Sequence, residues 1–71
     1  MSTYQINLLL EALVGIYSIQ ELIAAEPVVL SLVNHLGFDC EQAETFVAGA
    51  LQLKEARARL RDARQGHLYV Q

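Results

Sequence analysis

The chain has 71 residues, of which 54% are hydrophobic, with a formal net charge of −3 and a single cysteine. This length allows one domain, and one cysteine excludes an intrachain disulfide. Two histidines and one cysteine do not fall into a zinc-type spacing. No metal or cofactor is therefore expected, and small domains that lack such supports commonly rely on oligomerisation.

The N-terminal sequence MSTYQIN has no basic segment of the kind that opens a signal peptide. No uncharged block, residues 12–20 among them, reaches the roughly 20 residues that cross a bilayer. A lone free cysteine suits a reducing compartment. We therefore expect a cytoplasmic protein with no membrane contact.

The first predicted helix covers residues 3–25, with Ser2 or Thr3 as its N-cap. Its polar positions form one narrow stripe: Asn7, Glu11, Ser18 and Glu21. The rest of the circumference is apolar, and a helix that is apolar nearly all round is a buried helix. The two other helices expected in so short a chain cover only part of it. The uncovered side is expected to meet a second copy of the chain or another protein.

Two seams on this helix fit such a contact. The predicted homodimer interface follows the 4-3-4-3 spacing of coiled coils and consists of Leu9, Leu13, Ile16, Gln20 and Ile23. A second seam of smaller residues, Ala12, Gly15 and Ile19, allows close approach of helices. The alternative is that both seams belong to the intramolecular core. If one seam is intermolecular, a two-fold symmetric pair is the expected assembly.

A short second helix is predicted from Pro27 to residue 36, because proline suits the first turn of a helix. Gly37 is the expected left-handed residue that closes it. Asp39 is the expected N-cap of the third helix, with Gln42 three residues on as its capping-box partner.

The third predicted helix covers residues 40–65 and stops at Gly66. The predicted fold is thus all-α: a three-helix bundle with a long first, a short second and a long third helix, assembled as a dimer. Residues 1–66 form the helical domain, and residues 67–71 form a short apolar C-terminal tail. The middle of the third helix carries a broad apolar face, with Ala48, Gly49 and Ala50 as a close-packing spot.

All five Lys and Arg residues lie in one stretch, LKEARARLRDAR, at Lys54, Arg57, Arg59, Arg61 and Arg64. The predicted partner-binding residues come from this stretch and the tail: Arg57, Arg61, Arg64, Leu68 and Tyr69. The three arginines share a helical face and could follow phosphates, contact a protein, or form a solvated helix end. Three acidic residues, Asp39, Glu41 and Glu44, open the same helix. They disfavour nucleic acid, because a recognition helix places its N-terminal residues against the bases.

The segment LVNHLGFDCEQAETFVAGAL, residues 32–51, resembles the first helix, Gly-Phe loop and second helix of ubiquitin-associated domains. The resemblance covers 20 of 71 positions. It implies that Leu36, Gly37 and Phe38 correspond to the loop that contacts ubiquitin. The third helix lacks the break that would produce the last helix of such a domain, so no family is assigned.

No catalytic constellation is evident. Cys40 lies among Asp39 and Glu41 and has no histidine set beside it in the sequence, and the carboxylates form no acid–base pair. We expect a non-enzymatic protein–protein interaction module: a dimeric adaptor or inhibitor that binds and modulates a larger protein, like small regulators of bacteria and phages. The alternative is a helix-turn-helix-like regulator that binds nucleic acid through the basic end of the third helix.

Overall fold

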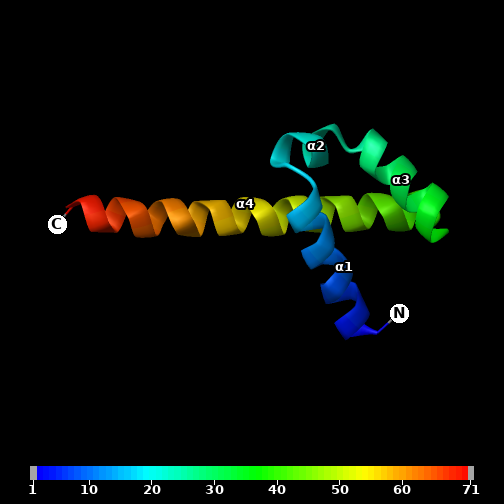
Figure 1. Cartoon of the computed structure of the whole chain (residues 1–71), viewed down its shortest axis with the longest axis horizontal. Coiled ribbons are helices and arrows are strands. Elements are labelled where there is room, and N and C mark those ends of the chain that lie inside the picture. The colour runs from blue at the N-terminus through cyan, green and yellow to red at the C-terminus, as the bar shows by residue number, and fades with distance from the viewer. Residues whose placement is uncertain (1, 71) are drawn as a thin grey trace.

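The computed structural model describes the backbone of residues 2–70 and the side chains of residues 2–64. Within this part of the chain all regular secondary structure is helical, which confirms the all-α prediction. There are four helices rather than three: α1 (Thr3–Ile16), α2 (Ile19–Ala24), α3 (Glu26–Leu36) and α4 (Cys40–Val70) (Figure 1).

The prediction of one continuous first helix was wrong, because the chain breaks between α1 and α2. Tyr17 leaves helical geometry and Ser18 begins a new helix as its N-cap. The Ser18 hydroxyl accepts from the Glu21 backbone N–H at 3.1 Å, and the Glu21 carboxylate accepts from the Ser18 N–H at 2.9 Å. This reciprocal capping box satisfies two backbone donors that a helix start otherwise leaves unpaired. The apolar segment therefore folds as two short helices at an angle.

The junction of α2 and α3 depends on Ala25, which has a positive φ of 65°. Ala25 is both the C-cap of α2 and the N-cap of α3. Pro27 follows in the first turn of α3, where a missing N–H leaves no intrahelical bond unmade. The predicted second helix thus exists with nearly the expected bounds.

The boundary between α3 and α4 is confirmed as the sequence predicts it. Gly37 closes α3 in the left-handed region at φ 70°, a conformation that glycine adopts without the steric cost of a Cβ. At the start of α4 the Gln42 N–H donates to the Asp39 carboxylate at 2.7 Å. The chain therefore reverses direction within a few residues.

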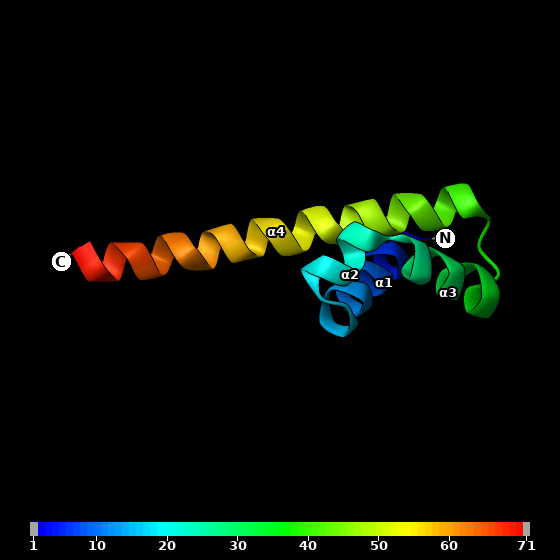
Figure 2. The same ribbon diagram turned by 90° about the horizontal axis from the view of Figure 1, so that it is seen from above.

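The prediction that the last helix stops at Gly66 was wrong, because α4 continues to Val70. Glycine lowers helix stability by about 1 kcal/mol relative to alanine but does not forbid the helix, and no proline follows to prevent its continuation. In both views the second half of α4 extends beyond the other three helices (Figures 1 and 2). We call residues 2–53 the body and residues 54–70 the arm.

Among the described side chains the hydrophobic core lies in the body, where all four helices contribute to it. Its buried side chains are Leu13, Leu22, Val28, Leu32, Ala43, Val47 and Ala50. Gly49 provides the expected close-packing spot, because a Cβ on it would lie 3.3 Å from the Leu10 side chain of α1. Of the helices described, none combines the length and apolar character that a membrane crossing requires.

Candidate interaction surface

The arm is attached to the body at its first turn by Lys54. Its ammonium group donates to the backbone carbonyls of Val14 at 2.8 Å and Tyr17 at 2.6 Å. Both carbonyls lie at the C-terminal end of α1, where helical carbonyls lack intrahelical partners and the macrodipole favours a positive charge. Lys54 therefore caps α1 from another helix and holds the break between α1 and α2 against α4.

Arg57, one turn further along α4, forms the second attachment. Its guanidinium makes a two-pronged salt bridge with the Glu11 carboxylate of α1, with one Nη1–Oε2 distance of 3.0 Å. The hydrogen bonds from Arg57 lower the pKa of Glu11 below its ordinary value, and Glu11 in turn raises the pKa of Arg57. Both side chains are about half exposed, so solvent screens much of this attraction. Arg57 thus has a partner within its own chain.

Beyond Arg57 the arm leaves the body. Arg59, Arg61 and Arg64 are exposed, and Leu60 between them keeps 55% of its surface accessible. Helical spacing would permit Arg59 to pair with Glu55 or Asp62. Among the described side chains, however, the only salt bridge is that of Arg57 with Glu11. Long charged side chains on an exposed helix often gain little by pairing, so three arginines remain available to a partner.

The predicted partner-binding residues thus divide into three groups. Arg57 belongs to the junction with the body, while Arg61 and Arg64 lie on the exposed arm. Leu68 and Tyr69 lie on the helical backbone of α4, but their side chains are outside the described residues.

The predicted dimer seam does not lie on one helix, because the break at Tyr17 and Ser18 divides it. Leu13 is only 3% exposed and belongs to the core of the single chain, and Leu9 packs against that core. Ile16 and Ile23 are 70% and 62% exposed, and Gln20 is also exposed. Only these last three remain accessible for a contact between copies.

The outer side of α1 carries an apolar surface that sequence analysis did not single out. Tyr4, Leu8, Ala12 and Ile16 follow one another at intervals of four residues, and all four are exposed. Residues four apart lie on the same helical face, so these side chains form a row that we call the α1 ridge. Gly15, beside it, has open space where a Cβ would lie. The i, i+4 spacing of these residues could have indicated this face from the sequence. The other apolar residues around the helix made that spacing hard to distinguish.

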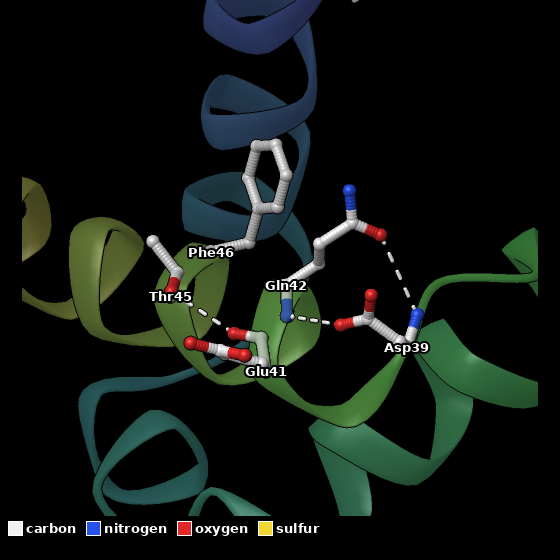
Figure 3. A pocket seen from close by; sticks show the side chains of 5 residues that line it. All are labelled: Asp39, Glu41, Gln42, Thr45 and Phe46. Atoms are coloured by element: carbon white, nitrogen blue, oxygen red, sulfur yellow. Dashed lines mark hydrogen bonds between the residues drawn. The ribbon is translucent and has the colours of Figure 1, made fainter.

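A polar hollow lies at the start of α4, lined by Asp39, Glu41, Gln42, Thr45 and Phe46 (Figure 3). Several of its polar groups are hydrogen-bonded within the helix start itself. Gln42 and Asp39 form the capping interaction, and the Thr45 hydroxyl donates to the Glu41 carbonyl at 2.9 Å. The Phe46 ring points toward α1 in this view. The hollow is thus an ordinary helix N-terminus.

An apolar hollow of about 340 Å³ lies between α1 and α4, lined by Ile6, Leu10, Thr45, Phe46 and Gly49. Phe46 stacks on Phe38 with ring centroids 5.3 Å apart. This pair lies beside the α3–α4 turn. An aromatic pair of this kind stabilises the fold by about 0.5–1.5 kcal/mol more than its buried area alone would. The hollow offers no charged side chain to orient a small molecule.

No hydrogen bond joins the candidate reactive side chains, Cys40 and His35, in the described part of the chain. Cys40 is free and exposed at the first residue of α4. His35 is exposed in the last turn of α3, and its Nδ1 lies 3.0 Å from the Ser31 carbonyl. No cluster of three metal-ligating side chains exists in the described part of the chain.

Comparisons with known proteins give this surface no precedent. No family model matches the chain, and neither a curated protein nor a solved structure is significantly similar to it. The unbroken course of α4 also differs from the short last helix that the resemblance to ubiquitin-associated domains would require.

Proposed function

We propose that this protein is a small, non-enzymatic interaction module that pairs with a second copy and binds a larger protein as an adaptor or inhibitor. The observation that carries the proposal is the exposed arm, a helix that leaves its own core with Leu60 and three arginines accessible. A helical segment with no buried side chain in its described part gains burial only against a partner.

The total exposed area supports the same proposal. A compact monomer of 7.9 kDa is expected to expose about 4,400 Å², whereas this chain exposes 5285 Å². The excess of about 900 Å² is close to the roughly 800 Å² that one partner contributes to a standard protein–protein interface. The chain thus exposes, beyond what its size requires, about the area that one interface covers.

The α1 ridge is the surface that we assign to self-association. It combines two large exposed side chains at its N-terminal end, Tyr4 and Leu8, with Ile16 at the other. Contiguous apolar surface on a small protein commonly marks an interaction site. Two copies that pack their ridges by a two-fold axis bury the same residues from both sides.

The homodimer is tested by light scattering coupled to gel filtration. We expect the wild type to have a dimer mass at micromolar concentration, and Leu8→Glu or Ile16→Glu to have a monomer mass. Leu30→Glu, which adds the same charge at a half-exposed position of α3, is the matched control and should remain dimeric. A monomeric wild type, or a dimer that tolerates both ridge variants, removes the α1 ridge from the proposal.

Target binding is tested by affinity capture from lysate of the encoding organism, with and without nuclease. We expect a protein target that is retained after nuclease treatment and is lost when the arm is truncated after Arg57. If the captured material disappears with nuclease, and the chain binds random duplex through Arg61 and Arg64, the nucleic-acid alternative is correct instead.

A further inference from the structure

A narrow apolar row begins at the last residue of the body and continues along the arm. Leu53, Ala56, Leu60 and Ala63 follow the 3-4-3 spacing of a coiled-coil seam. Leu53 is half-buried and the other three are exposed. We call these four residues the arm stripe. A large and a small residue alternate along it, so a second helix can approach closely at the alanines and receive the leucines between its own side chains.

Arginines border the arm stripe on both sides. Arg57 and Arg64 lie at the position that follows each alanine, and Arg59 lies just before Leu60 on the other side. In a coiled coil these are the flanking positions that choose the partner by charge. Arg57 is neutralised by Glu11, whereas Arg59 and Arg64 form no salt bridge among the described side chains. A helix laid on the stripe therefore meets unpaired positive charge on both edges.

This charge pattern disfavours pairing of one arm with another. In a parallel pair of arms, Arg59 of one helix faces Arg64 of the other. In an antiparallel pair, the edge with Arg59 faces the same edge of the other helix, and the edge with Arg64 does likewise. Like charges at such positions are destabilising. The two carboxylates of the arm, Glu55 and Asp62, lie on the side of Arg59 away from the stripe, and neither forms a salt bridge among the described side chains.

The acidic start of α4 in a second copy is also a poor match. Its exposed carboxylates at Glu41 and Glu44 share their face of α4 with Thr45 and Ala48 rather than with leucines. Duplex nucleic acid would satisfy the arginines but would leave the exposed Leu60 without an apolar contact. The arrangement fits a ligand that is both apolar along its centre and acidic along its edges.

We infer that the arm stripe is the docking site for an amphipathic helix of the target protein, one with a leucine-rich row flanked by Glu or Asp residues. This inference rests on the proposed function and specifies the partner of that function. Leu60 packs between the apolar side chains of the target helix, while Arg59 and Arg64 pair with its acidic edges. The two contacts together select an acidic amphipathic helix over a basic one.

Two synthetic probe peptides test the inference with the full-length protein. Each is a labelled three-heptad helix with the same leucine–alanine row, and its flanking residues are all Glu in one peptide and all Lys in the other. Fluorescence anisotropy at low salt should show the Glu peptide binding at least about tenfold more tightly than the Lys peptide, which corresponds to about 1.4 kcal/mol. The preference should shrink as salt is raised.

Charge reversal provides the decisive variant. Arg59→Glu combined with Arg64→Glu should reverse the preference, so that the Lys peptide binds more tightly than the Glu peptide. Both positions are exposed, and far-UV circular dichroism checks that the helix remains. Leu60→Asp should weaken binding of both peptides. Asp62→Lys, a charge reversal of the opposite sign beyond the stripe, is the matched control and should not weaken the preference for the Glu peptide.

Four outcomes would overturn the inference: no binding of the Glu peptide, equal binding of both peptides, a preference unmoved by the double reversal, or tighter binding of a 20-base-pair duplex at the same site. Dissociation of the homodimer by the double reversal would likewise show that a second copy occupies the arm. The proposed function has its own test: if the double reversal variant still captures the protein target from lysate, the module binds its target by another face and only the inference fails.

Discussion

The two halves of α4 form one helix but are stabilised in different ways. The first half contributes Ala43, Val47 and Ala50 to the core, and it contains residues of lower helix propensity such as Thr45 and Gly49. The second half has no buried side chain in its described part, and it consists largely of Ala, Arg, Leu, Lys, Glu and Gln, which favour helices. Tertiary packing therefore determines the body half, and local propensity determines the arm.

The largest expected effect is on the free energy of unfolding, and it compares a buried leucine of the body with an exposed leucine of the arm. Leu22 is 1% exposed in α2 and Leu60 is 55% exposed in the arm. Leu22→Ala should lower the free energy of unfolding by about 2–5 kcal/mol, because it removes buried methyl groups and leaves a cavity. A domain of this size has about 3–5 kcal/mol in total, so much of the variant should be unfolded.

Leu60→Ala is the matched control and should change the free energy of unfolding by no more than about 0.5 kcal/mol, as surface substitutions usually do. Urea denaturation followed by circular dichroism measures both. Equal destabilisation by the two variants would show that the arm packs as part of the cooperative core and is not stabilised by local helix propensity alone.

An intermediate effect is expected at the junction of the two halves. Lys54→Met keeps most of the side-chain length but removes the hydrogen bonds to the Val14 and Tyr17 carbonyls. Hydrogen bonds from charged groups contribute about 1.5–3 kcal/mol, so the variant should lose about that much stability in thermal or urea denaturation. Arg61→Met makes a comparable replacement on the exposed arm. It is the control and should have little effect on stability. If both variants behave alike, the Lys54 cap does not stabilise the fold.

The smallest expected effect concerns pH and the salt bridge of Arg57 with Glu11. The pKa of Glu11 is lowered in the folded state, so its ionised form stabilises the fold above the ordinary carboxyl pKa of about 4.3. That stabilisation is lost as the pH falls through the lowered value. Hydrogen bonds from Ser18 also lower the pKa of Glu21, which acts in the same direction.

Glu11→Gln should therefore flatten part of the acid-side decrease in melting temperature, measured between pH 6 and pH 3 by circular dichroism. Asp62→Asn, which changes a carboxylate of the arm that has no salt bridge among the described side chains, is the control and should keep the wild-type slope. An unchanged slope in the Glu11 variant would mean that the salt bridge does not persist in solution.

The sequence predicts those boundaries that depend on neighbouring residues. Gly37 and the Asp39–Gln42 cap were identified because their signals lie within a few positions of one another. The break before α2 was missed although Ser18 and Glu21 have the spacing of a capping box. Continuous hydrophobicity on both sides of Ser18 favoured an unbroken helix, and the local cap prevailed over it.

The candidate surface was predicted only in part, because it depends on which faces the fold covers. The exposure of Arg61 and Arg64 followed from the thinning apolar pattern of α4. The attachment of Lys54 to α1 joins residues 40 positions apart, and no local pattern encodes it. The same holds for Leu13, whose place in the core depended on the direction in which α1 crosses α4.

If copies of the chain pair as proposed, the break at Ser18 also limits how many can join. An unbroken helix over residues 3–24 would span three heptads with apolar side chains on nearly every side, and copies could stack on it in several staggered ways. Staggered contacts that do not close on themselves grow into filaments. With the break, α1 contains 14 residues, fewer than the three to four heptads of a sustained coiled coil. The capping box that shortens this helix therefore favours a finite particle over an open-ended polymer.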